Sequence, residues 1–136
     1  MTVLKAALIQ MRVTDNKERN VLEARRLVAA CAAEGADLVM LPEMFCCPYQ
    51  ASAFPAYAEP EDGWVTGQLS AAAREHRVIL VGGSMPERDA QGKIYNTCFV
   101  FDRQGERIAR HRKMHLFDID VTGGQRFQEK IGRAHV

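Results

Sequence analysis

The stretch LPEMFCCPYQ, residues 41–50, places an acid and two thiols close enough together to suggest nucleophilic chemistry. Glu43 directly follows an apolar run, and Cys46 and Cys47 come three and four residues later. A carboxylate within reach of a thiol can accept its proton, and the thiolate can then attack an electrophilic carbon. The stretch raises the hypothesis of a cysteine enzyme, although a carboxylate in a solvated loop explains Glu43 at least as well.

A second candidate is Lys113, which lies among apolar residues in HRKMHLFDID, residues 111–120. A fixed ammonium can stabilise negative charge that develops on a substrate. A lysine more commonly packs its stem and leaves its tip in water. His111 and His115 would share one side only on a helix, and the region has strand and loop character, so we expect no metal site there.

The composition is typical of one soluble domain. The chain has 136 residues, of which 47% are hydrophobic and 26% charged, and its net charge is +1. With no block of one sign, we expect neither nucleic acid nor a membrane as partner. The segment 1–13 is predicted to form a strand and not a signal peptide, and no apolar run reaches transmembrane length. The four cysteines are expected to be reduced thiols. We therefore expect a cytoplasmic protein.

Strands and helices must alternate to place these side chains. Apolar runs of strand character and amphipathic helical segments follow one another, and two further strand-like runs flank Gly105, which suits the left-handed position of a hairpin. The strand runs are 3–11, 36–41, 77–84, 96–102 and 106–112, and the helices are expected from Lys17 to Gly35 and over 67–76. Asp15 is expected to cap the first helix, with Glu18 completing a capping box.

This order predicts an α/β protein whose sheet carries helices on at least one face. In such sheets, sites gather beyond the carboxyl ends of strands, which is where Glu43 lies. The loop over residues 46–63 is long and contains three prolines, and loops of this length are uncommon unless they are functional.

Separated motifs along the chain resemble those of the nitrilase superfamily of carbon-nitrogen hydrolases, close to its omega-amidase branch. They are, in order, LPEMF, CPY, GGSMPE, IYNTCFVFD and RKMHLFDID, and the similarity runs from about Val3 to Glu129. The resemblance implies the N-terminal half of a four-layer α-β-β-α sandwich and a Glu-Lys-Cys triad that needs no cofactor. Glu43 matches the general base, and Lys113 matches the lysine of the triad.

The cysteine of that triad has no counterpart here. The family carries it in a G-x-C-Y-D type motif beyond the lysine, and this sequence has no such motif and no cysteine after Cys98. Neither Cys46 nor Cys47 matches the position, and Cys98 lies in a run of buried-sheet character, where thiols act as small apolar groups. We expect the chain to be truncated before its nucleophile and to be inactive by itself.

The last residues, KIGRAHV at 130–136, do not continue the resemblance. They translate AAG ATC GGA AGA GCA CAC GTC, which apart from its first base is a common sequencing adapter whose next codon is a stop. We therefore expect residues 1–129 to be a partial carbon-nitrogen hydrolase domain and 130–136 a non-native tail. A frameshift or a degenerate gene is the alternative. Because half a sandwich leaves apolar sheet surface uncovered, we expect poor solubility or a molten state for the isolated chain.

The resemblance also suggests a substrate. HLFDID with CPY resembles enzymes that deamidate dicarboxylic acid monoamides such as 2-oxoglutaramate and 2-oxosuccinamate. Tyr49 would then line the mouth of the pocket and Phe117 would help to wall it, although ordinary packing explains both. Carbamoyl amidases and nitrilases share the triad, and a non-catalytic subunit that binds an amide or assembles with intact homologues is a further possibility. We expect a homo-oligomer at full length.

Overall fold

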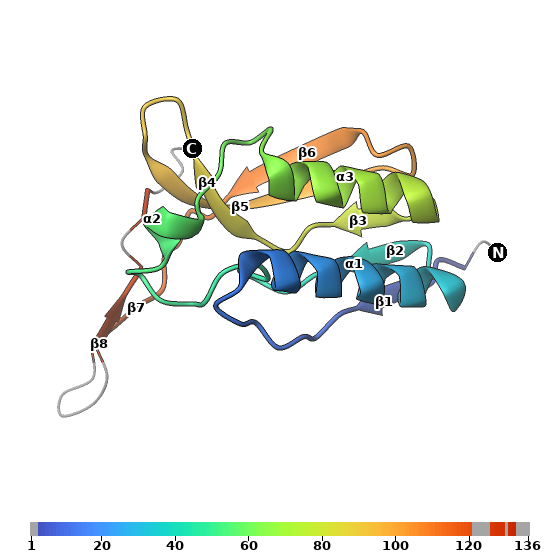
Figure 1. Cartoon of the computed structure of the whole chain (residues 1–136), viewed down its shortest axis with the longest axis horizontal. Coiled ribbons are helices and arrows are strands. Elements are labelled where there is room, and N and C mark those ends of the chain that lie inside the picture. The colour runs from blue at the N-terminus through green and yellow to red at the C-terminus, as the bar shows by residue number, and fades with distance from the viewer. Residues whose placement is uncertain (1–2, 121–125, 130, 133–136) are drawn as a thin grey trace.

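Six strands form one mixed sheet in the computed structural model, which describes residues 3–120, 126–129 and 131–132. The first three are parallel, and the long β5 runs antiparallel to β3, β4 and β6. Figure 1 labels these strands: β1 (Ala6–Leu8), β2 (Leu38–Met40), β3 (Ile79–Val81), β4 (Met85–Arg88), β5 (Ile94–Phe101) and β6 (Arg107–Arg112). The predicted α/β class and the β5–β6 hairpin are confirmed, with Gly105 at a φ of +82°.

Two long helices, α1 (Lys17–Ala33) and α3 (Trp64–His76), connect the parallel strands. α1 begins where the sequence predicted and is followed by Gly35 at a φ of +83°. The predicted cap was wrong. Asn16, not Asp15, is the N-cap, because its side chain accepts a hydrogen bond from the backbone N–H of Arg19 at 2.8 Å.

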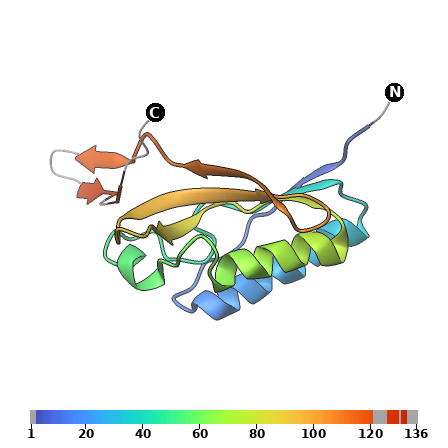
Figure 2. The ribbon, with the colours of Figure 1, turned by 90° about the horizontal axis from the view of Figure 1, so that it is seen from above.

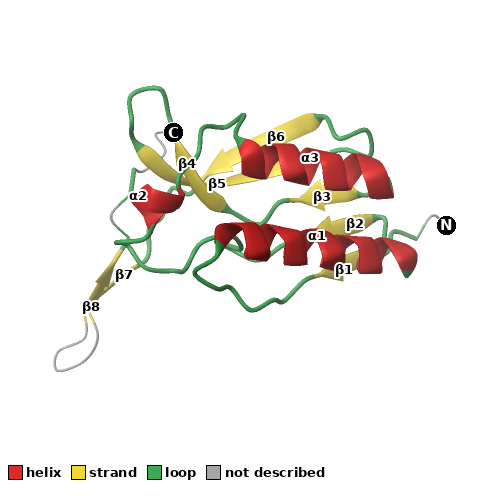
Figure 3. Ribbon diagram, viewed as in Figure 1, coloured by secondary structure: helices red, strands yellow, loops and turns green. Residues whose placement is uncertain are grey.

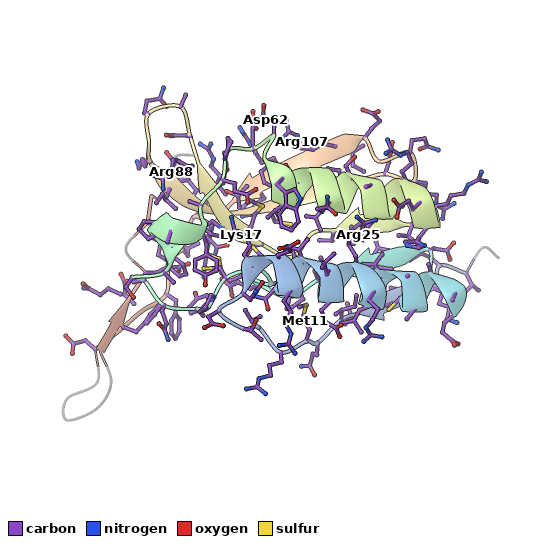
Figure 4. All side chains as sticks on the ribbon, in the orientation of Figure 1. Met11, Lys17, Arg25, Asp62, Arg88 and Arg107 are labelled. Carbon is purple, nitrogen blue, oxygen red and sulfur yellow. The ribbon has the colours of Figure 1, made fainter. Side chains whose placement is uncertain are left out.

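The core lies between these helices and one face of the sheet. Val39, Leu80 and Phe101 are adjacent in register across three strands and are almost fully buried on the helical side. Arg25 of α1 lies between the two helices (Figure 4) and donates hydrogen bonds to Gln68 and Glu75 of α3. Figure 2 shows both helices on the same face of the sheet.

The opposite face carries no helix in the described part of the chain (Figure 2). Leu8, Met40, Val81 and Val100 follow one another in register across this face, and Leu8 is 76% exposed and Met40 39% exposed. The described residues therefore form a helical layer and a sheet layer, two of the four layers that the sequence led us to expect.

One helical turn, β4 and the two strands of a separate sheet were not predicted. The loop over residues 46–63 contains one helical turn, α2 (Phe54–Tyr57), which buries Phe54. β4 was missed because Pro86 interrupts its strand signal. The proline is tolerated because β4 lies at the edge of the sheet, where a missing N–H costs little.

A separate two-stranded sheet, β7 (Asp118–Asp120) and β8 (Arg126–Gln128), lies at the same end of the molecule as α2 (Figures 1 and 3). The predicted non-native tail falls partly outside the described residues, namely at residues 130 and 133–136. Of the other two, Ile131 packs against the core and Gly132 donates its N–H to the carbonyl of Ile94. No helix in the described segments is both long enough and apolar enough to cross a membrane.

Candidate active site

A strained turn at the carboxyl end of β2 places Glu43. After Met40 the chain turns away from the sheet, and Met44 takes a φ of +50°, unusual for a residue with a side chain. Ser84 holds this turn, since its Oγ accepts the N–H of Met44 at 3.0 Å. Gly83 permits the contact: a Cβ there would lie 2.1 Å from the carbonyl oxygen of Pro42. The GGS stretch after β3 therefore shapes the loop that carries Glu43.

Lys113 follows β6 directly and reaches the same place. Its backbone N–H donates to the carbonyl of Asn96 on β5 at 2.8 Å, which extends the pairing of β6 by one residue. Its Nζ lies 2.8 Å from Oε1 of Glu43, although the two residues are 70 positions apart. The structure thus brings together the two residues that the sequence singled out as candidate catalytic groups.

Two further residues, which sequence reasoning did not select, complete this cluster. Oε2 of Glu129 lies 3.1 Å from Nζ of Lys113, and its side chain is fully buried. Nδ2 of Asn96 lies 2.8 Å from Oε1 of Glu43 and 3.0 Å from Oε1 of Glu129. Asn96 falls inside the quoted motif IYNTCFVFD and Glu129 at the end of the region that resembles the nitrilase superfamily, but neither was selected, because only the folded chain brings them into this cluster.

Tyr49 lies beside the cluster, whereas Phe117 lies further out. The hydroxyl of Tyr49 is 3.3 Å from Nζ of Lys113 and 3.5 Å from Oε1 of Glu43, and its ring stacks on Phe127 at a centroid distance of 5.4 Å. The ring of Phe117 also packs against Phe127, at 6.1 Å, and is 48% exposed. Tyr49 therefore contacts the charged groups directly, while Phe117 reaches the cluster through its backbone.

Burial and hydrogen bonding oppose each other in this cluster, and hydrogen bonding prevails at the charged groups. Burial alone would lower the pKa of Lys113, but its bonds to the two carboxylates and to Tyr49 raise it. Burial would raise the pKa of Glu129, but donors from the Phe117 backbone, Asn96 and Lys113 lower it. For Tyr49 burial prevails and raises the pKa, so its phenol stays protonated. At neutral pH the cluster therefore holds an ammonium beside ionised Glu129.

A cleft of about 320 Å³ opens beside these groups on the face of the sheet without helices. Glu43, Asn96 and Lys113 line it together with Cys98 and His111, which face each other across β5 and β6. The cleft is large enough for a small amide. Within the described segments, no group of three histidine, cysteine or acidic side chains is arranged to hold a metal ion.

The cysteines of the chain are poorly placed to attack a substrate. Cys46 and Cys47 are fully buried, and burial raises the pKa of each thiol to about 12. Cys98 was expected to be buried in the sheet. It is half-buried and faces the cleft, and burial raises its pKa even though a backbone hydrogen bond from Gly82 opposes this. Its thiol lies 3.9 Å from the carbonyl oxygen of Phe99. Neither Cys46 nor Cys47 is therefore placed to act as a nucleophile beside Glu43.

The chain belongs to the carbon-nitrogen hydrolase family: the family model described as carbon-nitrogen hydrolase matches residues 5–134. Among its relatives, the chain is 52% identical over 128 residues to Nitrilase homolog 2 of Dictyostelium discoideum, covering 93% of this chain and 39% of that protein. It is 49% identical over 129 residues to Omega-amidase NIT2 of Mus musculus, covering 95% of this chain and 46% of that protein.

Solved structures agree with this assignment. The crystal structure of Saccharomyces cerevisiae Nit3, a member of branch 10 of the nitrilase superfamily, superposes with a TM-score of 0.77 at 36% identity, covering 83% of this chain and 45% of that one. Membership of the nitrilase superfamily, similarity to omega-amidases and the fold class are thereby confirmed. The chain spans less than half the length of each of these three relatives.

Proposed function

We propose that the complete protein hydrolyses the C–N bond of a small amide, releasing ammonia from a dicarboxylic acid monoamide as an omega-amidase does. The observation that carries this proposal is the 2.8 Å contact between Lys113 and Glu43 at the edge of a cleft of about 320 Å³. The similarity to omega-amidases supports the choice of reaction.

The hydrogen bonds to Glu43 leave one oxygen for proton transfer. Lys113, Asn96 and Tyr49 all contact Oε1 of Glu43. No described residue is hydrogen-bonded to Oε2. A base needs an oxygen that is not already committed to donors, because a proton must be able to reach it. Oε2 is therefore the oxygen that would take the proton of an incoming thiol.

The reaction then follows from the residue types. A cysteine that this sequence does not contain gives its proton to Glu43, and its thiolate attacks the amide carbon. The ammonium of Lys113 stabilises the oxyanion of the tetrahedral intermediate. The C–N bond breaks as Glu43 returns the proton to the leaving nitrogen, which departs as ammonia. Glu43 next takes a proton from water, the hydroxide attacks the thioester, and the acid leaves as the thiol is restored.

Tyr49 and Phe117 are proposed to shape substrate binding. Tyr49 contacts Lys113 and would close the cleft on the side where Lys113 binds the substrate oxyanion. The exposed ring of Phe117 would form an outer wall of the cleft. Carbamoyl amines and nitriles are alternative substrates, because the same groups serve their hydrolysis.

A non-catalytic role in binding or assembly is the second candidate. It is favoured by one observation: no described cysteine is hydrogen-bonded to Glu43, and the two nearest in sequence are buried. Under this hypothesis the cleft would bind an amide without cleaving it.

The experiment that decides begins with the gene. Amplifying the locus from source DNA tests the proposed tail: we expect the natural sequence to depart from KIGRAHV at residues 130–136 and to continue to a cysteine in a G-x-C-Y-D type motif. The encoded protein is then assayed for ammonia release from omega-amides, carbamoyl amines and nitriles. Release from omega-amides supports the amidase, and binding without release supports the second candidate. A cytoplasmic location and a homo-oligomer at full length stay predictions, which fractionation and sedimentation would test.

A further inference from the structure

Asn96 contacts the candidate catalytic groups but has no role in the reaction steps proposed above. It lies on β5, is 2% exposed, and faces the cleft from the middle of the sheet. Its carbonyl also accepts the backbone N–H of Lys113 at 2.8 Å. Asn96 is thus bonded to all three charged residues of the cluster, to Lys113 through the backbone and to Glu43 and Glu129 through its side chain.

The orientation of its side chain follows from its partners. Nδ2 lies 2.8 Å from Oε1 of Glu43 and 3.0 Å from Oε1 of Glu129. Ionised carboxylates only accept hydrogen bonds, so the amide nitrogen and not the amide oxygen must face them. The NH₂ group has two hydrogens, one for each carboxylate.

Because this proposal deepens the amidase function, it rests on that function. We propose that Asn96 is a positioning residue that bridges the two carboxylates and holds Glu43 with Oε2 turned toward the incoming thiol. The contacts form a closed ring in which Glu43 and Glu129 alternate with two donors, Lys113 and Asn96.

A neutral donor suits a base that must gain and lose a proton. A second cation at this position would stabilise the carboxylate and weaken its basicity, whereas a third acid would repel it. When Oε2 of Glu43 takes a proton, Oε1 becomes a carbonyl-like oxygen that still accepts from Asn96. The bridge therefore keeps the geometry of the base unchanged through both protonation states.

The first test measures whether Asn96 is hydrogen-bonded to Glu129, and it does not depend on enzyme activity. Carbon-13 NMR of the glutamate carboxyl groups is followed against pH in the complete protein, with the Glu129 signal assigned by Glu129→Gln. In Asn96→Ala the pKa of Glu129 should rise toward its ordinary value, since a donor is lost. The other charged groups that face Glu129, namely Glu43, Lys113 and Asp118, remain in place.

The control is Asn20→Ala, which removes a similarly buried asparagine far from the cleft, hydrogen-bonded to Thr14. It should leave the Glu129 titration unchanged. If Asn96→Ala does not fold, Asn96→Asp keeps the shape and should raise the same pKa through repulsion. An unchanged Glu129 titration in a folded Asn96 variant would overturn the proposal.

The second test uses the complete protein. Asn96→Ala should lower kcat for an omega-amide about 100-fold with a small effect on KM, because a displaced base acts on the chemical step. Asn96→Asp should be slower still at neutral pH and should recover as pH falls and its carboxyl becomes a donor. A role in packing alone predicts the reverse order, so an aspartate variant faster than the alanine variant at neutral pH would refute the bridge. If the unaltered protein released no ammonia, the proposed function would fail while the NMR result still decided the role of Asn96.

Discussion

Replacing Glu87 with glutamine should destabilise the sheet just ahead of Lys113. Glu87 is 1% exposed on β4, and its carboxylate accepts from Arg112 through Nε at 3.0 Å and Nη2 at 2.5 Å, and from Thr97 at 2.6 Å. The guanidinium of Arg112 also lies 3.9 Å from the ring centroid of Tyr95. This one carboxylate therefore ties β4, β5 and β6 together on the helical side of the sheet.

The size of the loss follows from burial. Burial alone would raise the pKa of Glu87, but the bonds from Arg112 and Thr97 lower it, so the group is ionised and paired at neutral pH. Removing one partner of a buried ion pair leaves the other charge unpaired and costs about 3 kcal/mol. The matched control is Glu61→Gln, whose carboxylate pairs with Arg110 at 2.7 Å at the surface and should contribute less than about 1 kcal/mol.

Urea unfolding of the complete protein and of its Glu87→Gln and Glu61→Gln variants, followed by circular dichroism at neutral pH, measures both losses. Because the pKa of Glu87 is lowered by folding, its contribution is present above the ordinary value of 4.5 and is lost as pH falls through the folded value. The difference between Glu87→Gln and the unaltered chain should therefore shrink in acid. Equal losses in the Glu87 and Glu61 variants would refute this reasoning.

Three further predictions concern the turn that carries Glu43, the buried charge of Glu129 and the sheet face without helices. Gly83→Ala should cost about 1–3 kcal/mol more than Gly92→Ala in urea unfolding, because both have a positive φ but only a Cβ at Gly83 meets a backbone carbonyl; equal costs would contradict the strained turn. Because folding lowers the pKa of Glu129, its stabilisation is present above the ordinary pKa of 4.5 and is lost as the pH falls. In Glu129→Gln the free energy of unfolding should therefore fall less steeply in acid than in the unaltered protein. The same pH dependence in both proteins would count against the pairing of Glu129. The isolated chain should self-associate through the sheet face without helices. Leu8→Lys, at a residue of that face that is 76% exposed, should shift sedimentation toward monomer, and no shift would argue for another surface.

Local signals in the sequence predicted much of the scaffold. Glu43 was expected beyond the carboxyl end of a buried strand, and the run of apolar residues before Pro42 is such a strand. Gly105 marked the hairpin because only a residue that tolerates a positive φ fits that turn. The cap of α1 was misplaced by one residue because Asp15 and Asn16 are both good caps, and the choice between them depends on the hydrogen bond to Arg19.

The closed ring could not be predicted in the same way. Asn96 lies in the motif IYNTCFVFD, but the motif does not show which of its side chains faces Glu43. Asn96 joins the ring through its place on β5, and Glu129 joins it because the chain returns after β8. β4 was hidden because Pro86, which follows Gly82 and Gly83 closely, interrupts its strand signal. Both glycines allow another backbone segment to come close: Phe99 at Gly82, and Pro42, next to the candidate base Glu43, at Gly83.

A double-mutant cycle on the complete protein tests the central claim most directly. Ammonia release from an omega-amide is compared for the unaltered protein, Glu43→Gln, Lys113→Met and the double variant. If the acid and the amine act as one unit, each single change should lower kcat/KM at least about 1,000-fold, and the double variant should be little worse than the poorer single one. Near-normal activity in either single variant, or losses that simply multiply, would contradict the account.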